Sequence, residues 1–124
     1  RYDNAALLRR AGVQVAITTG ETYKAFNLRQ EAGNAVAYGL PYDEALRAVT
    51  LYPAQIFGVA DRYGTLEPGK VANVVVWDGD PLELLTNVEH VIIRGREVPL
   101  QSRETMLRDR YMNLDENVRT YRRP

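Results

Sequence analysis

The sequence changes its pattern at Gly58, and this change predicts an α/β fold. Before Gly58, apolar residues recur at spacings of three and four, most clearly over 25–38, which is typical of helices that bury one face. After Gly58, two runs rich in β-branched residues, 72–77 and 88–94, are joined by turn-forming residues. We therefore expect a helical part first and a small antiparallel sheet after it.

Within the helical part, one αβ unit of a parallel sheet is predicted at the start. We expect helices over 4–10, 25–38, 42–50 and 54–57, and a strand over 13–19. The first helix, a glycine turn and the strand follow one another as in a parallel α/β sheet.

After the sheet, the sequence predicts a last helix over 102–111 and then a polar tail. Glu104 lies in the first turn of this helix, where a carboxylate is favourable. Ser102 with Thr105 lacks the acid that would complete a capping box. We expect the tail, 113–124, to be disordered unless a partner holds it.

Metal-binding residues are scarce, since the chain has one His and no Cys in 124 residues. Neither a zinc site of Cys and His nor a His-rich catalytic metal site can come from this chain alone. We interpret His90 as an ordinary sheet residue. Asp78 and Asp80 are interpreted as turn residues, because calcium needs more oxygen ligands than their loop offers.

The charges balance, with 16 Lys and Arg against 16 Asp and Glu. A chain without net charge has no overall field for nucleic acid or an anionic membrane, and we expect neither as a partner. The arginines near the C-terminus alternate with acidic residues, which favours a solvated helix face. No signal peptide or membrane-spanning run is evident, so we expect a soluble chain of undetermined compartment. Its start at Arg1, without Met, favours a piece of a longer protein.

Three segments carry a specific resemblance. Residues 44–54 are EALRAVTLYPA, 64–76 are GTLEPGKVANVVV and 88–98 are VEHVIIRGREV. In this order and spacing they resemble the C-terminal part of the amidohydrolase superfamily, the metal-dependent hydrolases that include imidazolonepropionase-like and prolidase-like enzymes. The segment 28–39 is also similar to the helix that follows the last barrel strand in this group. Asn73 stands where the family usually has Asp, and we expect it to form hydrogen bonds at the turn.

The resemblance implies a division of the chain. Residues 1–60 would be the end of a (β/α)8 barrel, with its last strand and the helices after it. Residues 61–100 would be the C-terminal strands of a composite β-sandwich. Residues 101–124 would be a C-terminal helix and a polar tail.

The resemblance also implies the chemistry. Family enzymes hold one or two divalent metals, zinc or another, mainly through His residues, and the metal activates a water molecule. None of those His ligands can come from this chain, so we expect it to bind no metal by itself. It would be a catalytically incomplete C-terminal fragment of a hydrolase that acts on carbon–nitrogen bonds, in non-peptide or dipeptide substrates.

One catalytic residue of the family, an Asp that ends the last strand, is expected within this chain. The family pattern V-A-h-G-T-D corresponds here to VAITTGE, so Gly20 occupies the Asp position and Glu21 follows one position late. Glu21 is the candidate for the metal or proton-transfer role, and a solvated or helix-capping carboxylate is the alternative. Gly20, Glu21, Asn27 and Arg29 are candidates for the barrel mouth, where barrel enzymes keep their sites. Their alternatives are a helix cap for Asn27 and a surface ion pair for Arg29.

A second function class stays open, that of a non-catalytic assembly fragment. An exposed sheet edge and an apolar surface facing the barrel would then be covered by self-association. The expected partner is a second copy of the chain or the missing N-terminal portion. Trp77 is expected at the sheet edge or at an interdomain seam, with ligand stacking as its alternative.

Overall fold

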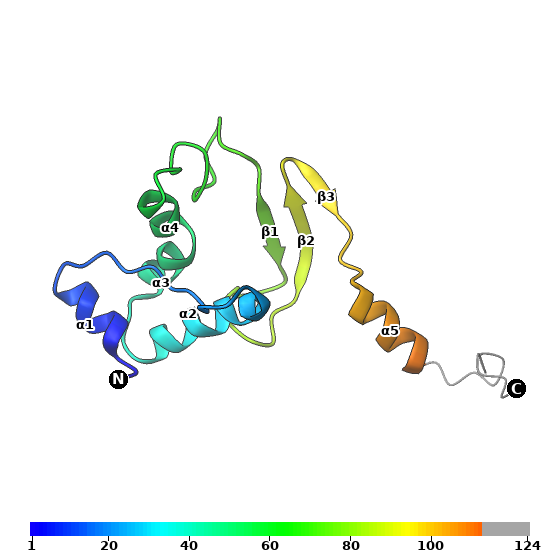
Figure 1. Ribbon diagram of the computed structural model, residues 1–124, viewed down its shortest axis with the longest axis horizontal. Coiled ribbons are helices and arrows are strands. Elements are labelled where there is room, and N and C mark those ends of the chain that lie inside the picture. Colours follow the sequence, from blue (N-terminus) through cyan, green and yellow to red (C-terminus); the bar gives the residue numbers. More distant parts are fainter. Residues whose placement is uncertain (113–124) are drawn as a thin grey trace, which may run out of the picture.

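The computed structural model describes residues 1–112 (Figure 1). They form helices α1 (Asn4–Arg10), α2 (Leu28–Ala37), α3 (Tyr42–Val49), α4 (Leu51–Ile56) and α5 (Arg103–Met112), the 3-10 helix η1 (Thr22–Asn27), and strands β1 (Val74–Trp77), β2 (Val88–Ile93) and β3 (Arg96–Val98). The predicted mixed α/β class is confirmed. The disorder predicted for residues 113–124 concerns a segment outside the described residues.

The predicted strand over 13–19 is wrong for this chain. The segment is extended, with Val15 and Ile17 half-buried, but it belongs to no sheet. Its backbone hydrogen bonds to helices run from the Val13 amide to the carbonyl oxygen of Leu8 in α1 and from the Ile17 amide to that of Ala48 in α3, both at 3.0 Å. A strand is defined by ladder hydrogen bonds to a neighbouring strand, and the described part of the chain brings no strand beside this segment.

The predicted helices are present, with shifted boundaries. The helix expected over 25–38 begins as the 3-10 turn of η1 and becomes α-helical at Leu28. The short helix expected from Ala54 begins three residues earlier, at Leu51. Pro53 lies in its first turn, where a missing backbone N–H costs no intrahelical hydrogen bond.

The start of α5 corrects the expectation of an incomplete cap. The Thr105 amide donates to Ser102 Oγ at 3.1 Å, and the Ser102 amide donates to Thr105 Oγ1 at 2.8 Å. The hydroxyl of Thr105 therefore takes the part of the acid in a reciprocal capping box.

The sheet is antiparallel in the order β1-β2-β3, as predicted. Val75 lies opposite Val91 in the first pair, and Ile92 lies opposite Glu97 in the second. The turn between β2 and β3 is formed by Arg94 and Gly95, whose φ angles are 52° and 75°. Two successive positive φ angles are typical of the tight hairpin turns that match strand twist.

The hairpin turn is held by the residues before β1. The Gly95 amide donates to the carbonyl oxygen of Ala72 at 3.0 Å, and the Arg94 amide donates to Asn73 Oδ1 at 2.9 Å. Asn73 thus forms a hydrogen bond at a turn, as predicted, although the turn is the one between β2 and β3.

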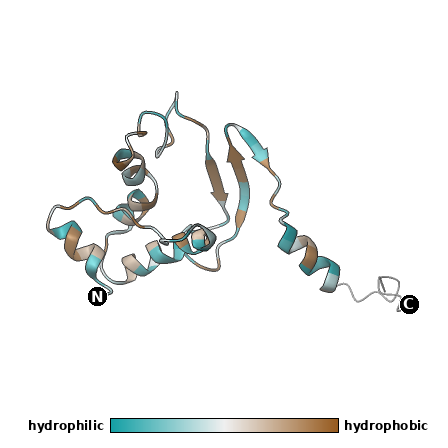
Figure 2. Cartoon of the chain, in the orientation of Figure 1, coloured by the Kyte–Doolittle hydropathy of each residue, from teal (hydrophilic) through white to brown (hydrophobic). Residues whose placement is uncertain are grey.

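The core is small and lies among the helices. Its buried members are mostly alanines, joined by two leucines: Ala6, Ala32, Leu40, Ala45 and Leu82. Large apolar side chains remain outside it, including Phe26, Phe57 and Leu85, which are 76%, 79% and 93% exposed. Figure 2 shows that β1 is hydrophobic along its length and β2 over part of it, and Val75 and Ile93 of these strands are 43% and 49% exposed. The described chain therefore leaves apolar surface on both its helical part and its sheet.

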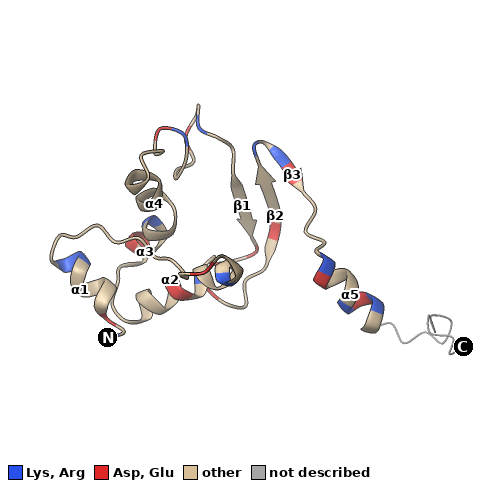
Figure 3. Ribbon diagram, viewed as in Figure 1, with Lys and Arg blue, Asp and Glu red and all other residues tan. Residues whose placement is uncertain are grey.

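The helix α5 follows β3 on the side of the sheet away from α1–α4 (Figure 1). Basic and acidic residues are interspersed along it (Figure 3). No helix among residues 1–112 is both long enough and apolar enough to cross a membrane.

Candidate functional site

The turn at Gly20 places the candidate site residues after the extended segment. Gly20 has a φ of 74°, a conformation that favours glycine. The Gly20 amide donates to Thr18 Oγ1 at 3.1 Å, and Thr19 Oγ1 donates to the carbonyl oxygen of Glu21 at 3.0 Å. Local hydrogen bonds therefore set the bend by which the chain enters η1.

Glu21 lies at the N-cap position of η1 with its side chain exposed. Its carboxylate makes no capping hydrogen bond, so the helix-capping alternative is not seen. Among residues 1–112, no group of three or more His, Cys, Asp or Glu side chains lies close enough to hold a metal ion. The residues around Glu21 do not by themselves fit a divalent metal, and its role in metal binding or proton transfer stays a prediction.

Asn27 lies at the other end of η1, at the N-cap position of α2. It is half-buried and makes no side-chain capping hydrogen bond, so the capping alternative is not seen here either. Its position at the barrel mouth stays a prediction.

Arg29 makes contacts that sequence reasoning missed. Its guanidinium donates to the carbonyl oxygens of Thr86 at 2.8 Å, Glu83 at 3.2 Å and Leu84 at 3.2 Å. It also lies over the ring of Trp77, 4.9 Å from the ring centre. Arg29 therefore connects α2 to the loop between β1 and β2, and Trp77 lies at the seam between the helices and the sheet. No sequence pattern predicts the hydrogen bonds of Arg29, because their acceptors are backbone carbonyls of residues more than 50 positions further along the chain.

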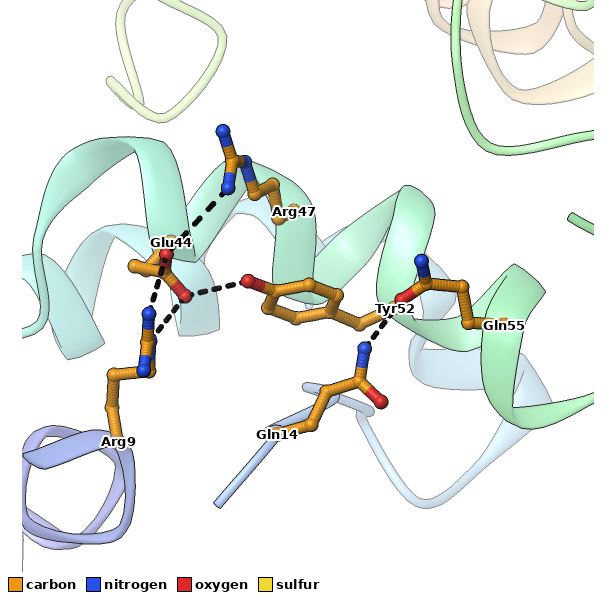
Figure 4. Close-up of polar contacts among 6 residues, drawn as sticks. All are labelled: Arg9, Gln14, Glu44, Arg47, Tyr52 and Gln55. Atoms are coloured by element: carbon orange, nitrogen blue, oxygen red, sulfur yellow. Dashed lines mark hydrogen bonds and ion pairs between the residues drawn. The ribbon is translucent and has the colours of Figure 1, made fainter. Parts of the chain in front are cut away.

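A second polar centre surrounds Glu44 (Figure 4). Arg9 donates to its carboxylate through Nε at 2.6 Å and Nη2 at 3.2 Å, and the Tyr52 hydroxyl donates to it at 2.8 Å. Arg47 Nη1 lies 3.8 Å from Oε1. These partners, Arg9 first and then Tyr52, lower the pKa of Glu44 below its ordinary value. Glu44 is thus the polar junction of α1, α3 and α4, with the Gln14–Gln55 hydrogen bond close by.

Asp78 and Asp80 are turn residues, as predicted. The Asp78 carboxylate accepts from the backbone amide of Asn87 at 2.7 Å and from its side-chain amide at 3.1 Å, and these bonds lower the pKa of Asp78. The Asp80 carboxylate accepts from the Leu82 amide at 2.8 Å and from the Tyr42 hydroxyl at 2.7 Å. The bond to Asp80 raises the pKa of Tyr42 to about 12. Both carboxylates are therefore occupied with the loop and its neighbours.

His90 lies in β2 and pairs with Glu97 of β3 across the exposed face of the sheet. Its Nδ1 atom is 2.6 Å from Glu97 Oε1. Both side chains are more than half exposed. The hydrogen bond to Glu97 raises the pKa of His90. This cross-strand pair agrees with the interpretation of His90 as a sheet residue.

Comparison with known proteins shows which protein family the chain belongs to. Residues 2–98 match the family described as the amidohydrolase family. The chain belongs to this family, which confirms the superfamily resemblance, and α5 lies beyond the matched residues.

Individual relatives are hydrolases of this family. The chain is 35% identical over 86 residues to an imidazolonepropionase of Sphingopyxis alaskensis, covering 65% of this chain and 21% of that protein. It is 36% identical over 75 residues to an N-acetylglucosamine-6-phosphate deacetylase of Haemophilus influenzae, covering 53% of this chain and 20% of that protein.

Solved structures agree in fold. An amidohydrolase from Thermotoga maritima is 35% identical with a TM-score of 0.74, over 79% of this chain and 26% of that one. A putative prolidase from Bifidobacterium longum is 30% identical with a TM-score of 0.64, over 86% of this chain and 29% of that one. The chain thus spans 20% to 29% of the length of these four relatives.

Proposed function

We propose that this chain is the C-terminal part of a metal-dependent amidohydrolase that cleaves carbon–nitrogen bonds in non-peptide or dipeptide substrates. The observation that carries the proposal is the family match over residues 2–98, in a chain that spans 21% of an imidazolonepropionase. In this proposal, 1–60 end the barrel, 61–100 supply strands of the composite sandwich, and 101–124 add a helix and a tail.

The extended segment 13–19 supports the barrel part of the proposal. Of the backbone amides of residues 14–19, that of Ile17 alone has a backbone partner among the described residues. Buried backbone groups need hydrogen-bond partners, and neighbouring strands of a parallel barrel would provide them. The flanking helices α1 and α2 then take the places of the helices on either side of a barrel strand.

The turn that follows would lie at the carboxyl end of that strand, where barrel enzymes keep their active sites. In the proposal, Gly20, Glu21 and Asn27 belong to the wall of the site, and Arg29, the fourth residue expected at the barrel mouth, follows them at the start of α2. Because the described residues hold no set that fits a metal, the proposal assigns the metal ligands to residues outside this chain. Glu21 would act beside that metal only if the bend that Gly20 allows directs its carboxylate toward the site.

The test compares the complete coding region with the 124-residue chain. We expect the complete region to encode a His-x-His segment after a predicted strand, and its product to hydrolyse members of a panel of non-peptide amides and dipeptides. The hydrolysis should stop with a chelator and return with zinc. The 124-residue chain should show no hydrolysis. A product without hydrolysis and without bound metal, or a coding region that begins near Arg1, would contradict the proposal.

A second candidate function, a self-associating assembly fragment, is favoured by the exposed apolar side chains. Phe57 and Leu85 are 79% and 93% exposed, and such surface is usually covered by a partner. We propose that the partner is either a second copy of the chain or the N-terminal portion of the same protein. Light scattering of the purified chain distinguishes these candidates. A dimer or larger species supports self-association, and a stable monomer contradicts it.

A further inference from the structure

The loop between β1 and β2, residues 78–87, has its first and last residues joined by hydrogen bonds. The Asp78 amide donates to the carbonyl oxygen of Asn87 at 3.1 Å, while the Asn87 amide donates to the Asp78 carboxylate at 2.7 Å. Hydrogen bonds therefore join the two ends of the loop, and its middle is a compact element that other parts of the chain can contact.

The helix α2 lies directly against this loop. At Gly33, one turn after Arg29, a Cβ atom would be 2.8 Å from the carbonyl oxygen of Leu82, so the two backbones are in contact. Leu82 is 8% exposed and joins the same buried cluster as Ala32. The Tyr42 hydroxyl of α3 adds its hydrogen bond to the same loop. The loop is thus the bridge between the helices and the sheet.

Arg29 is suited to hold this bridge because of the shape of its side chain. A guanidinium is planar and carries five N–H donors in a fixed fork, so it can serve several carbonyls at once. Its flat face can rest on an aromatic ring at the same time, as it does on Trp77. A lysine ammonium is a point charge and cannot reproduce both contacts.

The same arginine is the second residue of α2, immediately after η1. The segment 20–27 has few other anchors. Its two largest side chains, Tyr23 and Phe26, are 69% and 76% exposed. Its hydrogen bonds are local, such as the one from the Lys24 amide to the carbonyl oxygen of Glu21. The placement of this segment therefore depends on how the start of α2 is held.

We propose that Arg29 is a positioning residue, which fixes the segment 20–27 relative to the sheet by binding the loop 78–87. The inference rests on the proposed function for the importance of that segment as an active-site wall. It departs from the expectation that Arg29 lines the barrel mouth as a substrate contact. Arg29 would act on the site through the loop instead.

Hydrogen exchange measured by mass spectrometry on the full chain tests this inference. Arg29→Met should speed the exchange of amides in 20–28 by about tenfold or more, because one charge-assisted hydrogen bond is worth at least such a factor in a local opening equilibrium. Arg29→Lys should leave most of this acceleration in place. The control Arg10→Met, at the exposed end of α1, should leave 20–28 unchanged.

A second readout is acrylamide quenching of Trp77, the one Trp of the chain. Quenching should increase in Arg29→Met and less in Arg29→Lys, since an ammonium can still cover the ring. Exchange in 20–28 that equals the parent's would overturn the inference, and so would equal acceleration over all helices. Full recovery with Lys would also overturn it, because a packing role needs only the side-chain stem. None of these readouts requires hydrolysis, so a failure of the proposed function is seen separately.

Discussion

Glu44 connects three of the helices, α1, α3 and α4, through its carboxylate. Its carboxylate has partners from α1, from its own helix α3 and from α4, and it is only 12% exposed. These contacts give a structural role to Glu44, the first residue of the segment EALRAVT that carries part of the family resemblance. A carboxylate with charge-assisted and neutral donors around it is strongly favoured in its ionised form.

The lowered pKa of Glu44 predicts an acid-dependent stability. A carboxyl whose pKa is lower in the folded state stabilises the fold above its unfolded pKa, near 4.5, and loses this contribution as the pH falls through the folded pKa. Glu44→Gln should therefore be less stable than the parent at pH 7, and the difference should shrink at acid pH. Urea unfolding at both pH values measures this.

The exposed Glu31→Gln serves as the control for this experiment, and its effect should be small at both pH values. A stability difference for Glu44→Gln that stays constant between pH 7 and pH 3 would contradict the assigned cause, because a protonated Glu44 resembles Gln.

At the scale of elements, the β2–β3 hairpin is stabilised by a residue outside it. Asn73 precedes β1, yet its side-chain oxygen accepts from the Arg94 amide in the hairpin turn. Arg94 itself has a positive φ, which is costly for a residue with a side chain. The hydrogen bond therefore helps to offset a strained turn.

This contact predicts that Asp is accepted at position 73 and Ala is not. Asn73→Asp keeps the acceptor oxygen and should change the free energy of unfolding little. Asn73→Ala removes the acceptor and should cost about 1 kcal/mol, the typical net value of one hydrogen bond. Thermal unfolding of both variants measures the difference, and equal losses would show that the acceptor is not what matters.

The contact between α2 and the loop 78–87 predicts an unusual result for a glycine in a helix. Replacing a helical glycine with alanine normally gains roughly 1 kcal/mol. At Gly33, however, the new methyl group would meet a backbone carbonyl at 2.8 Å, and such overpacking costs about 1–3 kcal/mol. Gly33→Ala should therefore destabilise the chain.

The exposed position Asn34, in the same helix, provides the matched control for Gly33→Ala. Asn34→Ala should be neutral or slightly stabilising, because alanine has the higher helix propensity and meets no clash there. Chemical denaturation of both variants decides this. An increase in stability for Gly33→Ala would mean that the loop moves away at little cost.

Elements set by local sequence were predictable, whereas contacts between distant residues were not. The helices and the hairpin follow from apolar spacing and turn residues such as Gly95. The segment 13–19 has a strand's composition but lacks the neighbouring strands that would pair with it. Arg29 was singled out from its place after the last-strand turn, but its binding to three carbonyls has no local pattern. The partnership of Glu44 with Arg9 spans 35 residues and is equally invisible in the sequence.

At the level of the whole molecule, the chain matches the amidohydrolase family over residues 2–98, yet its described residues bury only a small core. Its buried side chains are mainly alanines, and Leu40 and Leu82 are the larger ones among residues 1–112. A chain of this kind that covers 26% of a solved amidohydrolase shares that enzyme's local structure without enclosing a comparable interior. In the proposed function, the rest of the enzyme covers the exposed apolar side chains and brings the metal ligands.

In the proposed enzyme, the metal site is built by residues outside these 124. The most direct test is the zinc content of the purified chain, measured by elemental analysis after incubation with zinc and removal of unbound metal. We expect far less than one zinc ion per chain, and no change for Glu21→Gln. One zinc ion per chain, lost in Glu21→Gln, would contradict it.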